Sequence, residues 1–118
     1  DQAAVREAAV QLEEAFFSSS AVSDILCHPD ARVTSEVPFL LKRKEPEGIF
    51  YIRGQIDILA EFPDHVVVID LKSDRQRNPE AHRQQVELYC EAAARITGKK
   101  TSGAVVYLRA PEEMAWIQ

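Results

Sequence analysis

The sequence has 118 residues, of which 46% are hydrophobic and 28% charged, a composition typical of one globular domain with its own core. Its 14 Lys and Arg residues are outnumbered by 19 Asp and Glu residues, and the net charge of −5 argues against a free-standing, high-affinity nucleic-acid binder. No apolar run approaches the roughly 20 residues of a membrane-spanning helix, and no signal peptide is recognisable.

The two cysteines, Cys27 and Cys90, lie far apart and have no metal-binding spacing. We interpret them as reduced, small hydrophobic side chains of an intracellular, cytoplasmic protein, and a structural disulfide is the less favoured alternative. The chain opens at Asp1 directly into a helical pattern, so we expect it to be a fragment of a longer protein.

The first third of the chain is expected to form two helices and a strand. Apolar residues at helical spacing predict a helix over residues 2–18 and a shorter one over residues 21–27. Alternating apolar residues then predict a strand over residues 32–42. Because Pro38 lacks a backbone N–H, this strand should lie at a sheet edge or carry a bulge there.

The next two predicted strands, residues 50–62 and 65–72, are joined by a short turn at Pro63 and Asp64. A turn that is symmetric about these two residues sets Asp57 directly opposite Asp70. Lys72, two residues after Asp70, lies on the same face of the sheet. The alternate residues form a second, apolar face that we expect to pack on helices: Ile52, Gly54, Ile56, Ile58, Val67, Ile69 and Leu71.

The last third of the chain is expected to contain one long helix and two short strands. Pro79 suits the first position of a helix, which the pattern extends to Thr97 and which Gly98 should end. Apolar runs over residues 102–108 and 114–117 predict the strands.

The chemistry of the facing acids points to a bound cation. Like charges opposite each other in a sheet are destabilising, and Mg²⁺ is typically held by one or two carboxylates together with waters and phosphate oxygens. The backbone carbonyl of Leu71 could add an oxygen, and Lys72 could act on a water or on a phosphate. Metal-assisted phosphodiester hydrolysis fits this set. The plainer alternative is a solvated salt bridge between Asp70 and Lys72.

Gln85 and Tyr89 are one helical turn apart and lie on one stripe of the long helix. Tyr89 could be a core residue and Gln85 a surface residue. Alternatively, both project over the acidic site, where they would bind a phosphate or hold the lysine.

Four short segments of the sequence resemble motifs of a known family, and they occur in the order that is typical of it. GQID at 54–57, VIDLKS at 68–73 and QVELY at 85–89 resemble the three nuclease motifs of the RecB-like branch of the PD-(D/E)xK superfamily. SEVPF at 35–39 resembles a strand of the nuclease domain at the C-terminus of AddA-type helicase–nucleases.

The resemblance implies an α/β fold of the restriction-endonuclease type, a mixed β-sheet flanked by helices in the order α-α-β-β-β-α-β. It implies a Mg²⁺- or Mn²⁺-dependent deoxyribonuclease, an exonuclease, in recombinational double-strand break repair. Asp57 and Asp70 would be metal ligands, Lys72 the catalytic lysine, and Gln85 and Tyr89 active-site neighbours. Glu36 is a further candidate ligand.

The sequence departs from the family at one point, because the Gly-x-x-x-His motif that usually supplies a histidine ligand is absent. We therefore expect residues 1–118 to be a single nuclease domain from the C-terminal part of a helicase–nuclease, without the family's first helix. The implied partners are DNA, helicase domains of the same parent chain and an AddB-like subunit. No association with a membrane is expected. The competing hypotheses are an inert nuclease-like scaffold or DNA-end-binding module, and an unrelated α/β domain.

Overall fold

The computed structural model describes residues 20–73, 78–108 and 114–117, and the helix expected over residues 2–18 lies outside this part of the chain. In chain order its elements are α2 (Ser20–Leu26), β1 (Arg32–Glu45), β2 (Gly48–Glu61), β3 (His65–Lys72), the 3₁₀ helix η1 (Pro79–His82), α3 (Arg83–Thr97), β4 (Lys100–Tyr107) and β5 (Met114–Ile117).

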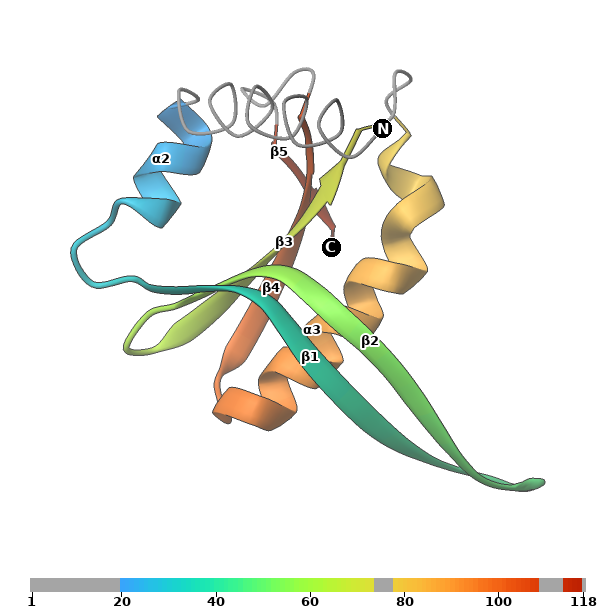
Figure 1. The fold of residues 1–118 in the computed structure, drawn as a ribbon. Coiled ribbons are helices and arrows are strands. Elements are labelled where there is room, and N and C mark those ends of the chain that lie inside the picture. Colours follow the sequence, from blue (N-terminus) through green and yellow to red (C-terminus); the bar gives the residue numbers. More distant parts are fainter. Residues whose placement is uncertain (1–19, 74–77, 109–113, 118) are drawn as a thin grey trace, which may run out of the picture.

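The described strands form one sheet in the order β1-β2-β3-β4-β5 (Figure 1). β1, β2 and β3 are antiparallel neighbours, β3 and β4 are parallel, and β4 and β5 are antiparallel. The long connection through α3 allows the parallel pairing, because parallel neighbours cannot be joined by a tight turn. The predicted mixed α/β sheet is therefore confirmed.

The predicted elements that lie in the described ranges are present with small changes in their bounds. β1 and β2 pair as far as Glu45 and Gly48, so both strands run past their predicted ends at residues 42 and 50 and are joined by a tight turn. The predicted helix from Pro79 begins as a 3₁₀ turn and becomes α-helical at Arg83. Gly98 ends it in the left-handed conformation, with φ of 71°. β1 is an edge strand, as Pro38 predicted.

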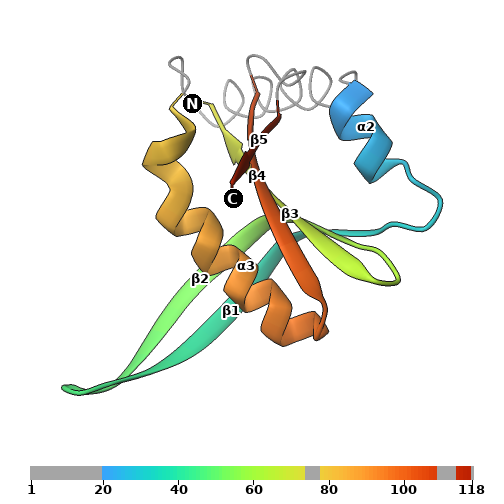
Figure 2. The same ribbon diagram turned by 180° about the vertical axis from the view of Figure 1, so that it is seen from behind.

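Helices lie against both faces of the sheet (Figures 1 and 2). Val66 and Val68 of β3 pack with Tyr89, Ala92 and Ala93 of α3. The alternate β3 residues pack with Val22 of α2: Val67 and Ile69. β3 is thus buried on both sides, as expected of a central strand whose faces are both covered.

The hairpin of β1 and β2 corrects one prediction. Ile58 packs in the cluster that contains Val22 of α2, whereas Ile56 and Ile52 pack in the cluster that contains α3. The single apolar face expected from Ile52 to Ile58 is therefore wrong. Strong twist is common in two-stranded ribbons, and here the change of side coincides with Glu36, which has a φ of 53°.

A close contact between α3 and β4 depends on a residue without a side chain. A Cβ atom at Gly103 would overlap Val86 Cγ1 and would lie 2.7 Å from Cys90 Sγ. Both neighbours are on α3, so glycine at this position lets the helix lie near the strand. Cys90 is thus a packing residue, and it and Cys27 are both free thiols, as expected.

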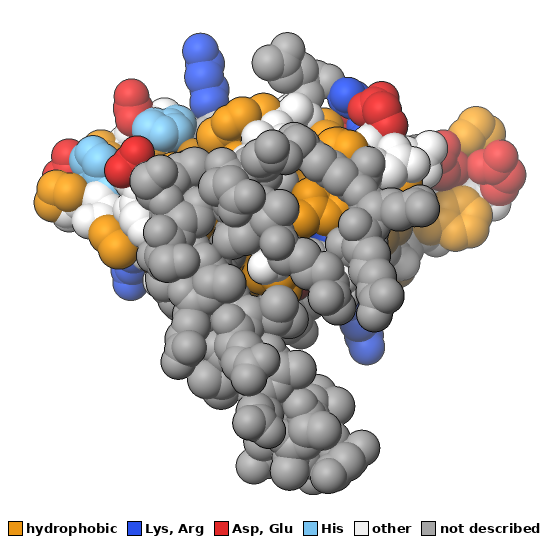
Figure 3. Space-filling view, turned by 90° about the horizontal axis from the view of Figure 1, so that it is seen from above, with side chains coloured by type: hydrophobic (Ala, Val, Ile, Leu, Met, Phe, Trp, Pro, Cys, Tyr) orange, Lys and Arg blue, Asp and Glu red, His pale blue; other side chains and the backbone are white. Residues whose placement is uncertain are grey.

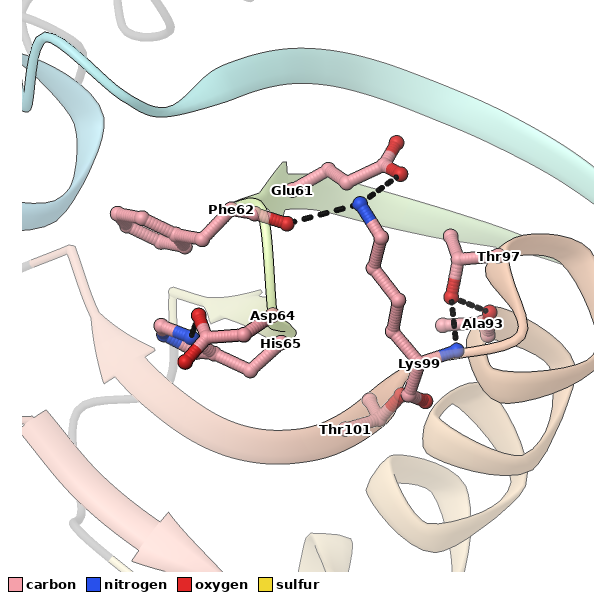
Figure 4. A network of polar contacts seen from close by, with 8 residues as sticks. All are labelled: Glu61, Phe62, Asp64, His65, Ala93, Thr97, Lys99 and Thr101. Atoms are coloured by element: carbon pink, nitrogen blue, oxygen red, sulfur yellow. Dashed lines mark hydrogen bonds and ion pairs between the residues drawn. The ribbon is translucent and has the colours of Figure 1, made fainter.

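A polar network holds the C-terminal end of α3 against the turn between β2 and β3 (Figure 4). The Lys99 ammonium donates to Glu61 Oε2 at 2.8 Å and to the Phe62 carbonyl at 2.9 Å. Thr97 Oγ1 donates to the Ala93 carbonyl and accepts from Lys99 N, at 2.8 and 3.2 Å. These bonds fix the helix end relative to the hairpin. No helix in the described ranges is long and apolar enough to cross a membrane.

Substitution of Gly103 by Ala is expected to destabilise the fold by about 1–3 kcal/mol, because the new methyl group would displace α3 from β4. The free energy of unfolding in urea measures the effect. Ser102→Ala, at the exposed neighbouring position, should change it by less than about 0.5 kcal/mol. Equal stability of the Gly103→Ala and wild-type chains would contradict the close packing.

Candidate active site

The candidate site lies where β2 and β3 stop pairing. The last pair in their register is Ile58 with Ile69, and Asp57 and Asp70 are the next residues on the two strands. The predicted register is therefore confirmed. Beyond this pair, the Asp57 carboxylate accepts a hydrogen bond from the backbone N–H of Leu71, at 2.8 Å. A side chain of β2 thus bonds to the backbone of β3 just past the end of the ladder.

Asp70 is buried, with only 1% of its surface exposed. Its Oδ2 atom has no hydrogen-bond partner among the described residues and lies 3.5 Å from the Lys72 ammonium. Burial raises the pKa of Asp70 to about 7, the Lys72 charge opposes this rise, and the nearby Asp57 carboxylate adds to it. Two acids and one cation therefore lie close together, with Asp70 buried and Asp57 and Lys72 partly exposed.

A chain of hydrogen bonds links Lys72 to the core. The Lys72 ammonium donates to Gln85 Oε1 at 2.8 Å, and Gln85 Nε2 donates to the Tyr89 hydroxyl at 2.8 Å. The Tyr89 ring lies edge-on to Phe39, with the ring centroids 5.6 Å apart. Burial, followed by the charges of Asp70 and Asp57, raises the pKa of Tyr89. The sequence left two interpretations of Gln85 and Tyr89 open. In the structure Gln85 binds the Lys72 ammonium, and Tyr89 is a core residue that also lies near the two acids.

Glu36 lies opposite Asp57 in the register of β1 and β2. Ser35 pairs with Ile58 and Val37 pairs with Ile56, and the pairing is interrupted between them, where Glu36 and Asp57 lie. Glu36 has a positive φ of 53°, which is uncommon for a residue with a side chain. Backbone strain of this kind is concentrated at functional sites. The Glu36 side chain is exposed, and its role as a ligand stays a prediction.

The donors at this site suit a hard divalent cation. Asp70 Oδ2 is a buried anionic oxygen without a hydrogen bond, and Asp57 brings a second carboxylate beside it. Within the described ranges no three His, Cys, Asp or Glu side chains are grouped so as to hold a metal ion. Two carboxylates are nevertheless an ordinary protein contribution for Mg²⁺, which keeps several waters and binds substrate phosphate. The Leu71 carbonyl as a ligand stays a prediction.

Sequence reasoning missed Tyr107. This residue follows Val105 and Val106 on β4 and is the partner of Lys72 in the parallel ladder. Its buried hydroxyl accepts a hydrogen bond from Asn78 N, at 3.0 Å, and its ring lies 6.3 Å from that of His82. Tyr107 thereby holds the start of η1 near the site. A tyrosine that directly follows the aliphatic residues 104–106 was the available signal.

Comparison with known proteins agrees with this geometry. The family model of the PD-(D/E)XK nuclease superfamily matches residues 2–115. The chain belongs to this superfamily. The predicted resemblance is thereby confirmed at the level of the superfamily, and the hypothesis of an unrelated α/β domain is set aside.

The curated relatives of this superfamily member include ATP-dependent helicase/nuclease subunits of the A type. The proteins of Streptococcus pyogenes serotype M5 (strain Manfredo) and serotype M49 (strain NZ131) are each 31% identical to it over 85 residues. The match covers 67% of this chain but 7% of each relative, so the chain spans a small part of their length.

A solved structure shares the fold of this superfamily member. The crystal structure of SSO0001 superimposes with a TM-score of 0.51, at 22% sequence identity, over 71% of this chain and 39% of the other. At this identity the likeness concerns the fold alone.

In the metal-free chain, Asp70→Asn is expected to stabilise the nuclease fold at pH 8 by about 1 kcal/mol or more. Because the pKa of Asp70 is raised to about 7, its ionised form is disfavoured in the folded state, and asparagine resembles the neutral form. The gain should be largest above pH 7 and shrink as the pH falls towards 4. Thermal unfolding in a chelator measures it.

The matched control is Asp24→Asn, which removes an exposed carboxylate on α2 and should have an effect within about 0.5 kcal/mol. No gain for Asp70→Asn at pH 8, or a gain that grows towards acidic pH, would contradict the assigned electrostatics.

Proposed function

We propose that this chain is a divalent-metal-dependent deoxyribonuclease domain that hydrolyses phosphodiester bonds within a helicase–nuclease. The observation that carries the proposal is the buried Asp70 oxygen, which lacks a hydrogen bond and lies beside Asp57 and 3.5 Å from the Lys72 ammonium. The family match and the names of the curated relatives support the reaction class.

In this proposal Asp57 and Asp70 hold a Mg²⁺ or Mn²⁺ ion, with the Leu71 carbonyl and Glu36 as further candidate ligands. When bound, the ion supplies Lewis-acid polarisation of the scissile phosphate and favours ionisation of a water. The hydrogen bond from Leu71 N–H orients the Asp57 carboxylate, so one of its oxygens is fixed before any ligand arrives.

Lys72 is the catalytic lysine in the same scheme. Its ammonium donates a hydrogen bond to Gln85 Oε1 and lies 3.5 Å from Asp70 Oδ2, and these two contacts fix its position. A cation placed in this way can donate a hydrogen bond to a phosphate oxygen and offset the negative charge that develops during hydrolysis. Gln85 and Tyr89 are positioning residues, because they act on the substrate through the lysine.

The names of the curated relatives also suggest a wider role for the domain, which is part of the same proposal. We infer that the domain acts on DNA delivered by helicase domains of its parent chain, with an AddB-like subunit, in the cytoplasm and in recombinational repair of double-strand breaks. The net charge of −5 supports delivery by other domains, because an acidic chain does not collect DNA efficiently by itself.

Cleavage of labelled single-stranded DNA by the full chain, in the presence of Mg²⁺ or Mn²⁺ and of a chelator, tests the proposal. Asp57→Ala, Asp70→Ala and Lys72→Ala should each lower the rate by at least about 100-fold, because each removes a group that acts on the reacting phosphate. The exposed Asp64→Ala serves as the control and should cleave like wild type. An Asp70→Ala chain that retains wild-type cleavage would refute the proposal.

Gln85→Met should slow cleavage by about 10- to 100-fold, because the Lys72 ammonium loses the acceptor that fixes its position. Gln84→Met alters the neighbouring, exposed glutamine of the same helix and should leave the rate unchanged. Single-turnover rates at saturating DNA separate this effect on the chemical step from one on binding. Equal rates for the two variants would remove Gln85 from the proposed machinery.

The competing proposal is an inert, nuclease-like scaffold or DNA-end-binding module, which the acidic net charge favours. It predicts no cleavage under any metal condition, together with DNA binding that does not change in Asp57→Ala and Asp70→Ala. Metal-dependent cleavage that both substitutions abolish excludes it.

A further inference from the structure

The outer half of the β1–β2 hairpin has one packed side and one exposed side. It extends away from the other strands in both ribbon views (Figures 1 and 2). Phe39, Leu41 and Ile56 pack against α3, and their alternate neighbours are exposed. These exposed residues form cross-strand pairs and are here named the outer hairpin face: Pro38 with Gln55, Leu40 with Arg53, Lys42 with Tyr51, and Lys44 with Ile49.

The outer hairpin face begins next to the candidate active site along the chain, on the side of the hairpin away from α3. Gln55, Arg53 and Tyr51 alternate with Ile52 and Ile56, which pack in the cluster that contains α3, so they lie on the opposite side of β2. Gln55 is two residues from Asp57, and its partner Pro38 is two residues from Glu36. From Gln55 to Ile49 the face is about 20 Å long, at about 3.4 Å per residue.

The charge of this face is opposite to that of the chain. Lys42, Lys44 and Arg53 are exposed, and their side chains form no ion pair or hydrogen bond with other described residues. By contrast, Arg43 on the packed side is bound to Glu91 at 2.9 Å. No carboxylate occurs among the paired positions from Pro38 to Lys44 and from Ile49 to Gln55. A chain of net charge −5 thus has a cationic stretch on the hairpin that carries Asp57.

Large apolar side chains lie between these cations. Tyr51 is 63% exposed, Leu40 58% and Ile49 54%, and each is paired across the hairpin with a cation. An aromatic side chain on a cationic track is typical of surfaces that bind single strands, since the cations bind phosphates and the flat ring stacks on a base. In a duplex the base faces are stacked on one another, so the ring of Tyr51 would have no base face to stack on.

We infer that the outer hairpin face binds single-stranded DNA on the strand pair that carries Asp57. The inference rests on the proposed nuclease function and names a surface that holds the substrate near the site. Lys42, Lys44 and Arg53 contact successive phosphates, and Tyr51 stacks on a base. The binding stretch ends at the hairpin tip, where Glu45 and Glu47 are exposed and where Figure 3 shows acidic and hydrophobic side chains together at the right.

Fluorescence anisotropy of a labelled oligothymidylate with the full 118-residue chain, in a chelator, tests the inference without cleavage. Lys42→Gln/Arg53→Gln should weaken binding and reduce the slope of log affinity against log salt by about 1.4, at about 0.7 per phosphate contact. The matched control is Arg32→Gln/Lys100→Gln, which removes the same charge from exposed positions outside this face and should keep the wild-type slope.

A second pair of variants tests the stacking residue. Tyr51→Ser should weaken binding by at least about fivefold, because it removes a platform for a base. Phe50→Ser removes an aromatic side chain of 49% exposure from the neighbouring position on the opposite side of the hairpin, and should bind like wild type. Circular dichroism of both variants verifies that the hairpin is retained.

The outcomes separate this inference from the proposed function. Wild-type cleavage together with equal DNA affinity for each test variant and its control overturns the inference and leaves the nuclease intact. Selective loss of affinity without any cleavage supports the inference and counts against the proposed function. The inference is also overturned if the wild-type chain does not bind DNA. It is overturned as well if light scattering detects self-association that Tyr51→Ser abolishes, because the outer hairpin face would then bind a second copy of the chain.

Discussion

A hydrogen bond from a backbone amide to a side-chain carboxylate determines the shape of the site. Asp57 accepts the N–H of Leu71 at 2.8 Å just past the last recorded pair of β2 and β3. An N–H group left without an acceptor in a protein interior is costly, and this bond satisfies the Leu71 N–H where the ladder ends. Just beyond this point the hairpin changes side, and Ile56 and Ile52 pack in the cluster that contains α3.

The site concentrates unfavourable electrostatics that the rest of the fold must offset. Asp70 is buried beside a second acid, and burial raises its pKa to about 7. Lys72 reduces this cost, and Gln85 and Tyr89 tie the lysine to the packed side of α3. Local arrangements that oppose stability are expected at functional sites, because a ligand supplies the missing favourable interaction.

Much of this arrangement could be predicted from the sequence, because it follows from short-range rules. A turn centred on Pro63 and Asp64 fixed the register of Asp57 and Asp70, and one helical turn brought Gln85 and Tyr89 together. The twist at Glu36 could not be predicted, since alternation assumes a regular strand and positive φ leaves no pattern for a residue other than glycine. The roles of Asp57, Asp70 and Lys72 in catalysis remain predictions.

The central claim is that Asp57 and Asp70 hold one divalent ion together at the point where β2 and β3 separate. Anomalous diffraction from crystals of the full chain soaked in Mn²⁺ measures this directly. The account predicts one strong peak within coordination distance of a carboxylate oxygen of each residue, and its loss in Asp57→Asn crystals treated identically. A soaked wild-type crystal with no peak between the two carboxylates, or with a peak that Asp57→Asn leaves unchanged, would contradict the account.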